Sequence, residues 1–142
     1  MKEVNVIYWS STGNTQAMAE AVGAGVEEAG GKANVMEVSA ADVSMLKDAD
    51  SFALGASAMG DEELDAEMDD FVTAVEGICA GKTVGLFGSY DWGDGDWMRE
   101  WASRMEAAGA TVAGGEGVIA NNTPDEEALE NCRKLGETLA AV

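Results

Sequence analysis

Residues 4–15 read VNVIYWSSTGNT, and this stretch decides the fold of the chain. An apolar, strand-like run at residues 4–9 ends in hydroxyl and amide residues, and a helical pattern follows. Short side-chain donors and a glycine at a strand-to-helix turn can fold around an anion, and the first N–H groups of the helix point to the same spot. The stretch therefore predicts a phosphate-binding loop formed by Ser10, Ser11, Thr12, Gly13, Asn14 and Thr15.

The composition of this loop narrows the kind of phosphate it can bind. It contains no Lys or Arg, so it lacks the Gly-Lys-Ser/Thr ending of a Walker loop, and its spacing differs from the Gly-x-Gly-x-x-Gly of a dinucleotide fold. A neutral loop suits one terminal monoester phosphate. An ordinary Ser/Thr-rich helix cap is the alternative interpretation, and two later loops favour the phosphate.

Five short apolar runs alternate with amphipathic stretches along the chain. This alternation is typical of an α/β fold in which helices cover both faces of a parallel sheet. The predicted strands are Glu3 to Tyr8, Lys32 to Val38, Ser51 to Ala56, Thr83 to Gly88, and Thr111 to Ala120, the last interrupted by two glycines. The length of 142 residues suits a single domain, 1–142, with one core.

Apolar residues at helical spacing predict four helices. The residues that share a face are Met18, Val22, Val26 and Ala29; Met68, Phe71, Val72, Val75 and Cys79; Trp97, Met98, Trp101, Ala102 and Met105; and, as a buried stripe, Ala128, Cys132, Leu135 and Leu139. The last helix has the clearest start, with Thr123 as N-cap, Pro124 as first helical residue and Glu126 three residues after the cap. The pattern of residues 40–50 fits a short helix and a loop equally.

Two further loops follow the third and fourth predicted strands. They are Ser57-Ala58-Met59-Gly60-Asp61-Glu62 and Ser89-Tyr90-Asp91-Trp92-Gly93. The carboxyl ends of parallel strands face the same way, so all three loops converge at one edge of the sheet. Met59 and Trp92 could cover the faces of a flat ring, with backbone N–H groups and two acids at its rim. A Trp in a Gly- and Asp-rich loop has little core to join, whereas Met59 also fits plain packing.

The motifs YWSSTGNT (residues 8–15), SAMGDE (57–62) and FGSYDWGDG (87–95) resemble the three flavin-binding loops of the short-chain flavodoxins of anaerobic bacteria. The resemblance extends over essentially the whole chain, in order and spacing. It implies a five-stranded doubly wound sheet of order 2-1-3-4-5, the order that flavodoxins exemplify, with FMN bound where strands one and three diverge. It also implies a low-potential carrier that shuttles single electrons between redox enzymes, using non-covalently bound FMN in its semiquinone and hydroquinone forms.

The same resemblance implies roles for individual residues. Trp92 stacks on one face of the isoalloxazine and Met59 covers the other. Glu62 accepts a hydrogen bond from the flavin N3–H. Ser57 and Asn122 occupy positions that resemble polar contacts to the phosphate and the ribityl chain. Trp9, Trp97 and Trp101 are interpreted as packing residues.

The peptide Gly60-Asp61 carries the expected redox mechanism. In the resembled family the matching carbonyl rotates toward flavin N5 in the semiquinone, and only glycine reaches φ > 0 at little steric cost. The second electron makes an anionic hydroquinone beside many carboxylates, which predicts a strongly reducing couple. Ser11 and Asp91 stand where these flavodoxins carry glycine. A carboxylate at Asp91 would either destabilise the reduced flavin further or change the turn of the loop.

Charge predicts the kind of partner. Eight basic and 27 acidic residues give a net charge of −19, so neither nucleic acid nor an anionic membrane is expected to bind. The expected partners are redox proteins with basic docking surfaces, such as reductases and ferredoxin-type oxidoreductases. Residues 61–70, DEELDAEMDD, hold seven acids next to the second loop. A merely solvated acidic surface, as in a salt-adapted organism, remains an equal alternative.

Other residue types exclude several classes of site. The chain has no His, so no imidazole can serve acid–base catalysis or bind a metal. Cys79 and Cys132 stand singly in apolar patterns, which predicts core thiols in a reducing cytosol and no metal site. The first residues run into a strand and not into a signal peptide, and the apolar runs are shorter than a membrane span. We expect a cytoplasmic monomer without catalytic residues.

Three other functions are alternatives to the electron carrier. An FMN-dependent NAD(P)H:quinone-type or azo reductase of the same fold needs a nicotinamide site and usually extra loops or an obligate dimer, which this compact chain does not suggest. A phospho-acceptor receiver needs an Asp at the end of the third strand, where Ser57 stands. A cation-binding module at residues 61–70 is disfavoured because Leu64 and Met68 follow a helix face and not a calcium-loop spacing.

Overall fold

The computed structural model describes residues 3–10, 13–58, 64–90, 95–115 and 117–142. Six parallel strands form one sheet: β1 (Glu3–Trp9), β2 (Lys32–Glu37), β3 (Ser51–Ala56), β4 (Thr83–Tyr90), β5 (Thr111–Val112) and β6 (Val118–Asn121). The order is β2-β1-β3-β4-β5, and β6 also pairs with β4. The predicted fold class and strand order are therefore confirmed.

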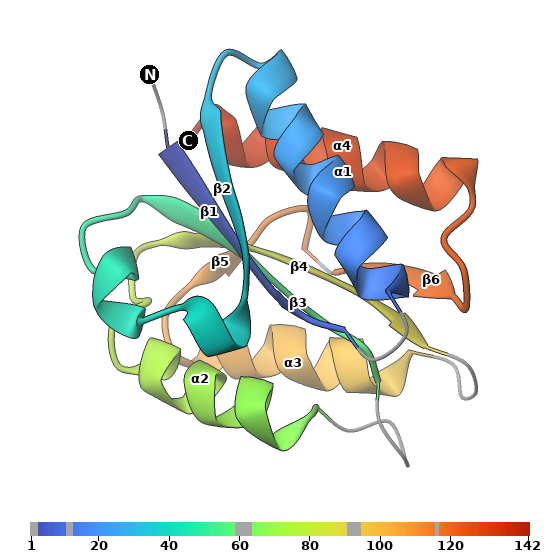
Figure 1. The fold of residues 1–142 in the computed structure, drawn as a ribbon. Coiled ribbons are helices and arrows are strands. Elements are labelled where there is room, and N and C mark those ends of the chain that lie inside the picture. Colours follow the sequence, from blue (N-terminus) through green and yellow to red (C-terminus); the bar gives the residue numbers. More distant parts are fainter. Residues whose placement is uncertain (1–2, 11–12, 59–63, 91–94, 116) are drawn as a thin grey trace.

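The sheet separates two apolar layers (Figure 1). Alternate residues of β1 point to opposite faces, so Val4 and Val6 pack with helices α1 (Asn14–Glu28) and α4 (Glu126–Ala140). Ile7 packs on the other face with α2 (Ala66–Glu76) and α3 (Asp96–Ala107). All six residues of β3 are buried, as expected of a central parallel strand covered on both faces.

The tryptophans outside the third loop pack as predicted. Trp97 and Trp101 are 2% and 1% exposed, and Trp9 is partly buried against the layer that contains α2 and α3. Both cysteines are buried free thiols. None of the helices in the described ranges combines the length and the apolar character that a bilayer crossing requires.

The predicted N-cap of the last helix is wrong. The helix begins at Glu126, and its N-cap is Asp125, whose carboxylate accepts a hydrogen bond of 2.8 Å from the N–H of Ala128. Pro124 is buried and lies before the cap. A carboxylate is a charge-assisted acceptor at the positive end of a helix, so Asp125 competes better for this position than the hydroxyl of Thr123.

The predicted fifth strand is two short strands in the structure. β5 pairs with β4 at Thr83↔Thr111, an offset of 28 residues, whereas β6 pairs at Phe87↔Val118, an offset of 31. The three extra residues (31 − 28 = 3) are taken up by the turn that contains Gly114 and Gly115, both with positive φ. Residues 40–50 contain the end of one 3-10 helix, Val38–Ala40, and the whole of a second, Val43–Leu46, but no α-helix.

Helices α1 and α4 pack at close range on their common face of the sheet (Figure 1). A Cβ on Gly136 would overlap the backbone carbonyl of Val22, and a Cβ on Gly25 would overlap that of Arg133. The two glycines therefore allow the helix backbones to approach more closely than any other residue would permit. This packing fixes the position of α1, whose first residues belong to the predicted phosphate loop.

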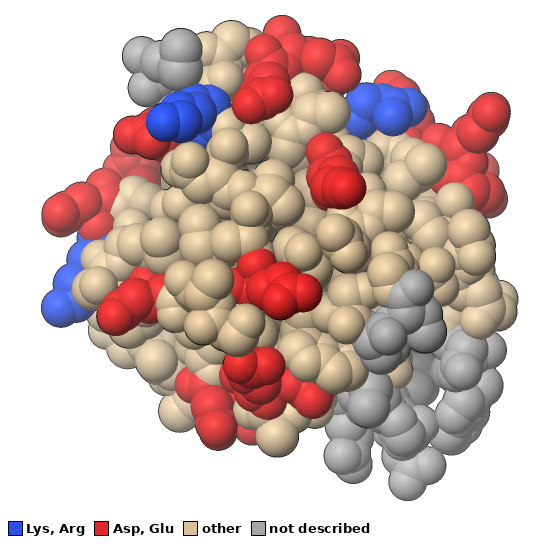
Figure 2. Space-filling view, in the orientation of Figure 1, with Lys and Arg blue, Asp and Glu red and all other residues tan. Residues whose placement is uncertain are grey.

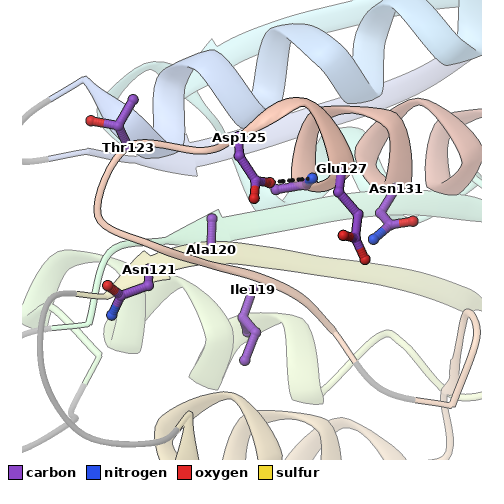
Figure 3. A pocket seen from close by; sticks show the side chains of 8 residues that line it. Ile119, Ala120, Asn121, Thr123, Asp125, Glu127 and Asn131 are labelled. Carbon is purple, nitrogen blue, oxygen red and sulfur yellow. Dashed lines mark hydrogen bonds between the residues drawn. The ribbon is translucent and has the colours of Figure 1, made fainter.

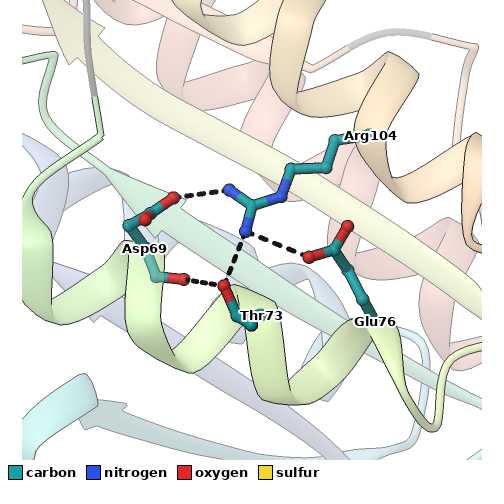
Figure 4. A network of polar contacts seen from close by, with 4 residues as sticks. All are labelled: Asp69, Thr73, Glu76 and Arg104. Carbon is teal, nitrogen blue, oxygen red and sulfur yellow. Dashed lines mark hydrogen bonds and ion pairs between the residues drawn. The ribbon is translucent and has the colours of Figure 1, made fainter.

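A polar network joins the two helices on the other face of the sheet (Figure 4). One guanidinium nitrogen of Arg104 in α3 lies 2.5 Å from Asp69 of α2. The other contacts the Thr73 hydroxyl at 2.8 Å and the Glu76 carboxylate at 3.0 Å. Burial disfavours the charge of Arg104, but the hydrogen bonds to Glu76 and Asp69 outweigh it and raise the pKa of the guanidinium. Arg104 thereby ties together the helices that follow the second and third loops.

Candidate functional site

The predicted loops begin at the carboxyl ends of β1, β3 and β4, which lie side by side at one edge of the sheet (Figure 1). Trp9 of β1 is paired with Ala56 of β3, and Gly55 of β3 with Phe87 of β4. The strand that follows β1 in the chain, β2, pairs on its other side, so this edge contains the point where the strand order reverses. Open α/β sheets bind ligands outside the carboxyl ends of their strands at such a point.

Three buried hydroxyl groups meet beneath this edge. Thr15 Oγ1 lies 2.8 Å from Ser57 Oγ and 3.1 Å from Ser89 Oγ, and the two serine hydroxyls lie 3.4 Å apart. The backbone N–H of Ser89 also donates to Thr15 Oγ1 at 3.3 Å. These three residues, the hydroxyl cluster, come from the first turn of α1, the end of β3 and β4. The cluster therefore connects all three loops through one set of hydrogen bonds.

The first loop ends in a tight turn that leads into α1. Gly13 is the N-cap of α1 with φ of +93°, and its N–H donates to Ser10 Oγ at 2.9 Å. A left-handed φ favours glycine, so the turn explains the residue at this position. Asn14 and Thr15, predicted as the last loop residues before a helical pattern, form the first turn of the helix.

The N-terminus of α1 differs electrostatically from those of the other helices. Among the described residues no side chain caps it, and its first turn contains no acidic residue. In contrast, α2, α3 and α4 carry acids in their first turns, and α2 and α4 are also capped by Asp65 and Asp125. The positive end of a helix dipole is thus neutralised by carboxylates in three helices but not in α1. This end suits an external anion, which is the property a phosphate group requires.

Two backbone hydrogen bonds join the start of the third loop to the second loop and to Asn122. The N–H of Ala58 donates to the carbonyl of Ser89 at 2.9 Å, and that of Asn122 donates to the carbonyl of Tyr90 at 2.6 Å. Asn122 has a positive φ of 58°, a conformation that asparagine adopts more readily than most residues. The ring of Tyr90 packs against Trp97 with centroids 5.5 Å apart. Asn122, which lies far along the chain from the three loops, is thus brought next to the end of β4.

The structure places half of the predicted site residues and brings them to one edge. Ser10, Gly13, Asn14, Thr15, Ser57, Ala58, Ser89, Tyr90 and Asn122 lie at the ends of β1, β3, β4 and β6 and at the start of α1. The other predicted residues lie outside the described ranges: Ser11, Thr12, Met59, Gly60, Asp61, Glu62, Asp91, Trp92 and Gly93. Sequence reasoning treated Thr15, Ser57 and Ser89 as separate contacts and missed that they bond to one another.

Other kinds of site find little support in the described part of the chain. Within it no three His, Cys, Asp or Glu side chains gather as a metal site would require. Burial raises the pKa of the Cys132 thiol to about 12 and also raises that of Cys79, so neither thiol is a thiolate nucleophile near neutral pH.

Comparison with known proteins agrees with this geometry. The family model described as Flavodoxin matches residues 6–136. A flavodoxin of Clostridium beijerinckii is 41% identical over 98% of this chain and 100% of its own length. A flavodoxin of Megasphaera elsdenii is 43% identical over 96% of this chain and 98% of its own. The solution structure of the two-electron reduced Megasphaera elsdenii flavodoxin superimposes with a TM-score of 0.90, covering 98% of this chain and 99% of that one, at 41% identity.

The fold, the strand-end loops and the similarity over nearly the full length lead to one assignment. The chain belongs to the flavodoxin family, whose members are FMN-binding electron-transfer proteins and not enzymes.

Proposed function

We propose that this flavodoxin is a low-potential one-electron carrier that binds the FMN phosphate in the loop of residues 10–15 against the N-terminus of α1. Bound FMN supplies the one-electron chemistry, because the flavin ring accepts electrons singly. The observation that carries the proposal is the acid-free N-terminus of α1 at the edge where β1, β3 and β4 end. The N–H groups of its first turn, which no described side chain caps, are the donors from which a phosphate would accept hydrogen bonds.

The hydroxyl cluster supports the same placement. Thr15 occupies the first turn of α1, and its side chain is buried and bonded to Ser57 and Ser89. This holds the first turn of the helix against the ends of β3 and β4. A rigid turn keeps its N–H groups in place before the ligand arrives, which lowers the entropic cost of binding.

The flavin ring is proposed to lie between the second and third loops, with Trp92 on one face and Met59 on the other. Glu62 is proposed to accept a hydrogen bond from flavin N3–H, and Gly60-Asp61 to present its carbonyl to N5. These five residues lie outside the described ranges. Support comes from the strand ends beside them, because the Ala58 N–H to Ser89 carbonyl bond joins the segments from which both loops continue.

Low potential follows from the charge of the protein. A net charge of −19 opposes the addition of negative charge to the flavin. One carboxylate about 10 Å away disfavours a new negative charge by about 0.4 kcal/mol in water and by about 1.7 kcal/mol at an effective dielectric constant of about 20. Several such carboxylates therefore shift the couple to more reducing values.

The partners are redox proteins, and we propose that their docking surfaces are basic. Acidic side chains are spread over the face of the molecule shown in Figure 2, with few Lys and Arg among them. Opposite charge steers two proteins together, and salt screens this attraction. The rate of electron transfer to a basic partner should therefore fall as ionic strength rises, whereas a flat salt profile would leave the acidic surface with a role in solubility only.

The central test compares FMN with riboflavin, which has the same ring and no phosphate. Calorimetric titration of the apoprotein should show FMN binding more than about hundredfold more tightly, because charge-assisted hydrogen bonds to the phosphate are among the strongest in proteins. Equal affinities would contradict the phosphate site. The holoprotein should show a flavin visible spectrum, and NADH or NADPH mixed with it should not bleach the flavin directly.

A further inference from the structure

The outer edge of β6 has no strand partner among the described strands. β6 pairs with β4 on one side only, from Phe87↔Val118 to Tyr90↔Asn121. The Asn122 N–H donates to the Tyr90 carbonyl, which fixes the residues that face β4. In a parallel ladder the backbone N–H and C=O of one residue face the same neighbour, and those of the next residue face the opposite side. Ile119 and Asn121 therefore present their backbone groups at the open edge.

A groove runs between this edge and the start of α4 (Figure 3). It has a volume of about 270 Å³, and its lining includes Ile119, Asn121, Glu127 and Asn131. A second hollow of about 220 Å³ shares Asn131 and extends along α4 to Lys134 and Thr138. An extended chain rises about 3.3 Å per residue, so the four residues of β6 offer an edge for a segment of about four residues.

The charge of the groove limits what can occupy it. Asp125 and Glu127 are both exposed and line the groove at the start of α4. The carboxylate of Asp125 caps α4, whereas that of Glu127 forms no hydrogen bond or ion pair with the rest of the described chain. A second copy of this protein also carries a net charge of −19, so like charges oppose pairing of two β6 edges. A positively charged segment is attracted by this net charge and by the two carboxylates, although Lys134 lines the second hollow.

We propose that β6 is a docking edge for an extended, basic segment of a partner protein. The segment adds to the sheet as a further strand, bonds to the backbone of Ile119 and Asn121, and directs a Lys or Arg to Glu127. Strand addition of this kind takes affinity from main-chain hydrogen bonds and specificity from alternate side chains. That the partner is a redox protein rests on the proposed function. β6 leads into Asn122, whose N–H donates to the carbonyl of Tyr90 at the sheet edge where FMN is proposed to bind.

The test uses the isotope-labelled holoprotein and the pentapeptide Lys-Val-Lys-Val-Lys with blocked ends. Saturating peptide should slow amide hydrogen exchange of Ile119 and Asn121 by more than about tenfold, because only these amides gain a partner. The amides of Val118 and Ala120 face β4 and should be unchanged. Saturable binding that leaves Ile119 and Asn121 unprotected would overturn the proposal, as would no binding up to about 10 mM.

Two N-methylated versions of the peptide separate strand addition from charge attraction. One is methylated at every odd position and the other at every even position, so both keep the same charge. Only alternate amides of an added strand face β6, so one version should lose binding and the other should retain it. Equal binding of both versions would show attraction by charge alone and would overturn the proposal.

A pair of variants tests the role of Glu127. Glu127→Gln should weaken peptide binding about two- to fivefold, the range measured for exposed ion pairs. Glu137→Gln removes the same charge from the same helix outside the groove and should leave binding unchanged. Equal effects of the two variants would contradict the assignment of Glu127. The flavin spectrum, recorded in the same samples, reports FMN binding separately, so failure of the docking edge and failure of the proposed function can be distinguished.

Discussion

The hydroxyl of Thr15, in the first turn of α1, lies 2.8 Å from the hydroxyl of Ser57, just beyond the end of β3. These residues are 42 positions apart in the chain, and Ser89 of β4 completes the cluster 3.1 Å from Thr15. All three side chains are buried. A buried hydroxyl needs a hydrogen-bond partner, so each member of the cluster depends on the other two.

Removal of one hydroxyl should loosen the phosphate end of the site. Thr15→Val keeps the shape of the side chain but leaves Ser57 and Ser89 with only their own 3.4 Å contact. We expect the free energy of unfolding of the apoprotein to fall by about 1–3 kcal/mol, and FMN to bind more weakly. Urea denaturation and FMN titration measure the two effects. Thr15→Ser retains the oxygen, so its free energy of unfolding and its FMN affinity should fall much less. Similar decreases in both variants would contradict a role for the hydroxyl.

A methyl group at the contact of α1 and α4 should destabilise the fold. The Cβ of Gly136→Ala would overlap the Val22 carbonyl, so the two helices must separate. We expect a loss of about 1–3 kcal/mol in thermal or urea unfolding, the usual cost of overpacking. Gly77→Ala is the matched control, because φ is −77° there and its Cβ would meet only ordinary contact distances. If Gly136→Ala is as stable as Gly77→Ala, the close approach of the helices is not as described.

Arg104 should contribute more to stability than an arginine paired within its own helix. Arg104→Met leaves Asp69 and Glu76 without the cation between them, and we expect a loss of about 1–2 kcal/mol. Added salt should restore part of this loss, because it screens the remaining acids. Arg133→Met, which removes a pair with Glu130 of the same helix, should have a smaller effect. Urea denaturation at low and high salt compares the two variants.

Cys132 should make stability depend on alkaline pH. Burial raises the pKa of its thiol from 9.0 to about 12 in the folded protein. Below about pH 9 the thiol is neutral in both states and ionisation has no effect. Between about pH 9 and 12 only the unfolded chain releases the proton, so the free energy of unfolding falls by up to about 1.4 kcal/mol per pH unit. The stability difference between the wild type and Cys132→Ala should shrink over this range, and a constant difference would show that the thiol titrates normally.

Loss of the proposed stacking residue should weaken the flavin complex. Trp92→Ala removes a large aromatic face, and we expect FMN affinity to fall about tenfold. Fluorescence titration of the apoprotein with FMN measures this change. Trp101→Phe is a useful control, since Trp101 is buried in the α2 and α3 layer and its variant should bind FMN normally. Unchanged affinity in Trp92→Ala would remove Trp92 from the site.

Several features were predictable because their signals are local. The strand Ser51–Ala56 was predicted with the bounds that the structure gives it, because a short apolar run between turn residues has few alternatives. The hydroxyl-rich run before a helical pattern predicts a strand-to-helix turn, and the turn at Gly13 confirms it, although α1 begins at Asn14, inside the run. The four helices also agree, apart from their ends.

Other features depended on distant parts of the chain. The division of the last strand into β5 and β6 depends on the register of each against β4. The ion pairs of Arg104 with α2 and the contact of Gly136 with Val22 each join two separate segments. The sequence of either segment alone therefore does not predict them.

The sequence by itself determined the alternation of strands and helices and the chemistry of the three loops, because hydrophobic periodicity and turn residues act over a few neighbouring positions. Only the tertiary structure decided which of the polar residues meet. Thr15 and Ser89 are 74 positions apart and yet share a hydrogen bond. Their meeting depends on the parallel order of the sheet and on the position in which α1 packs, and both are properties of the whole assembled core.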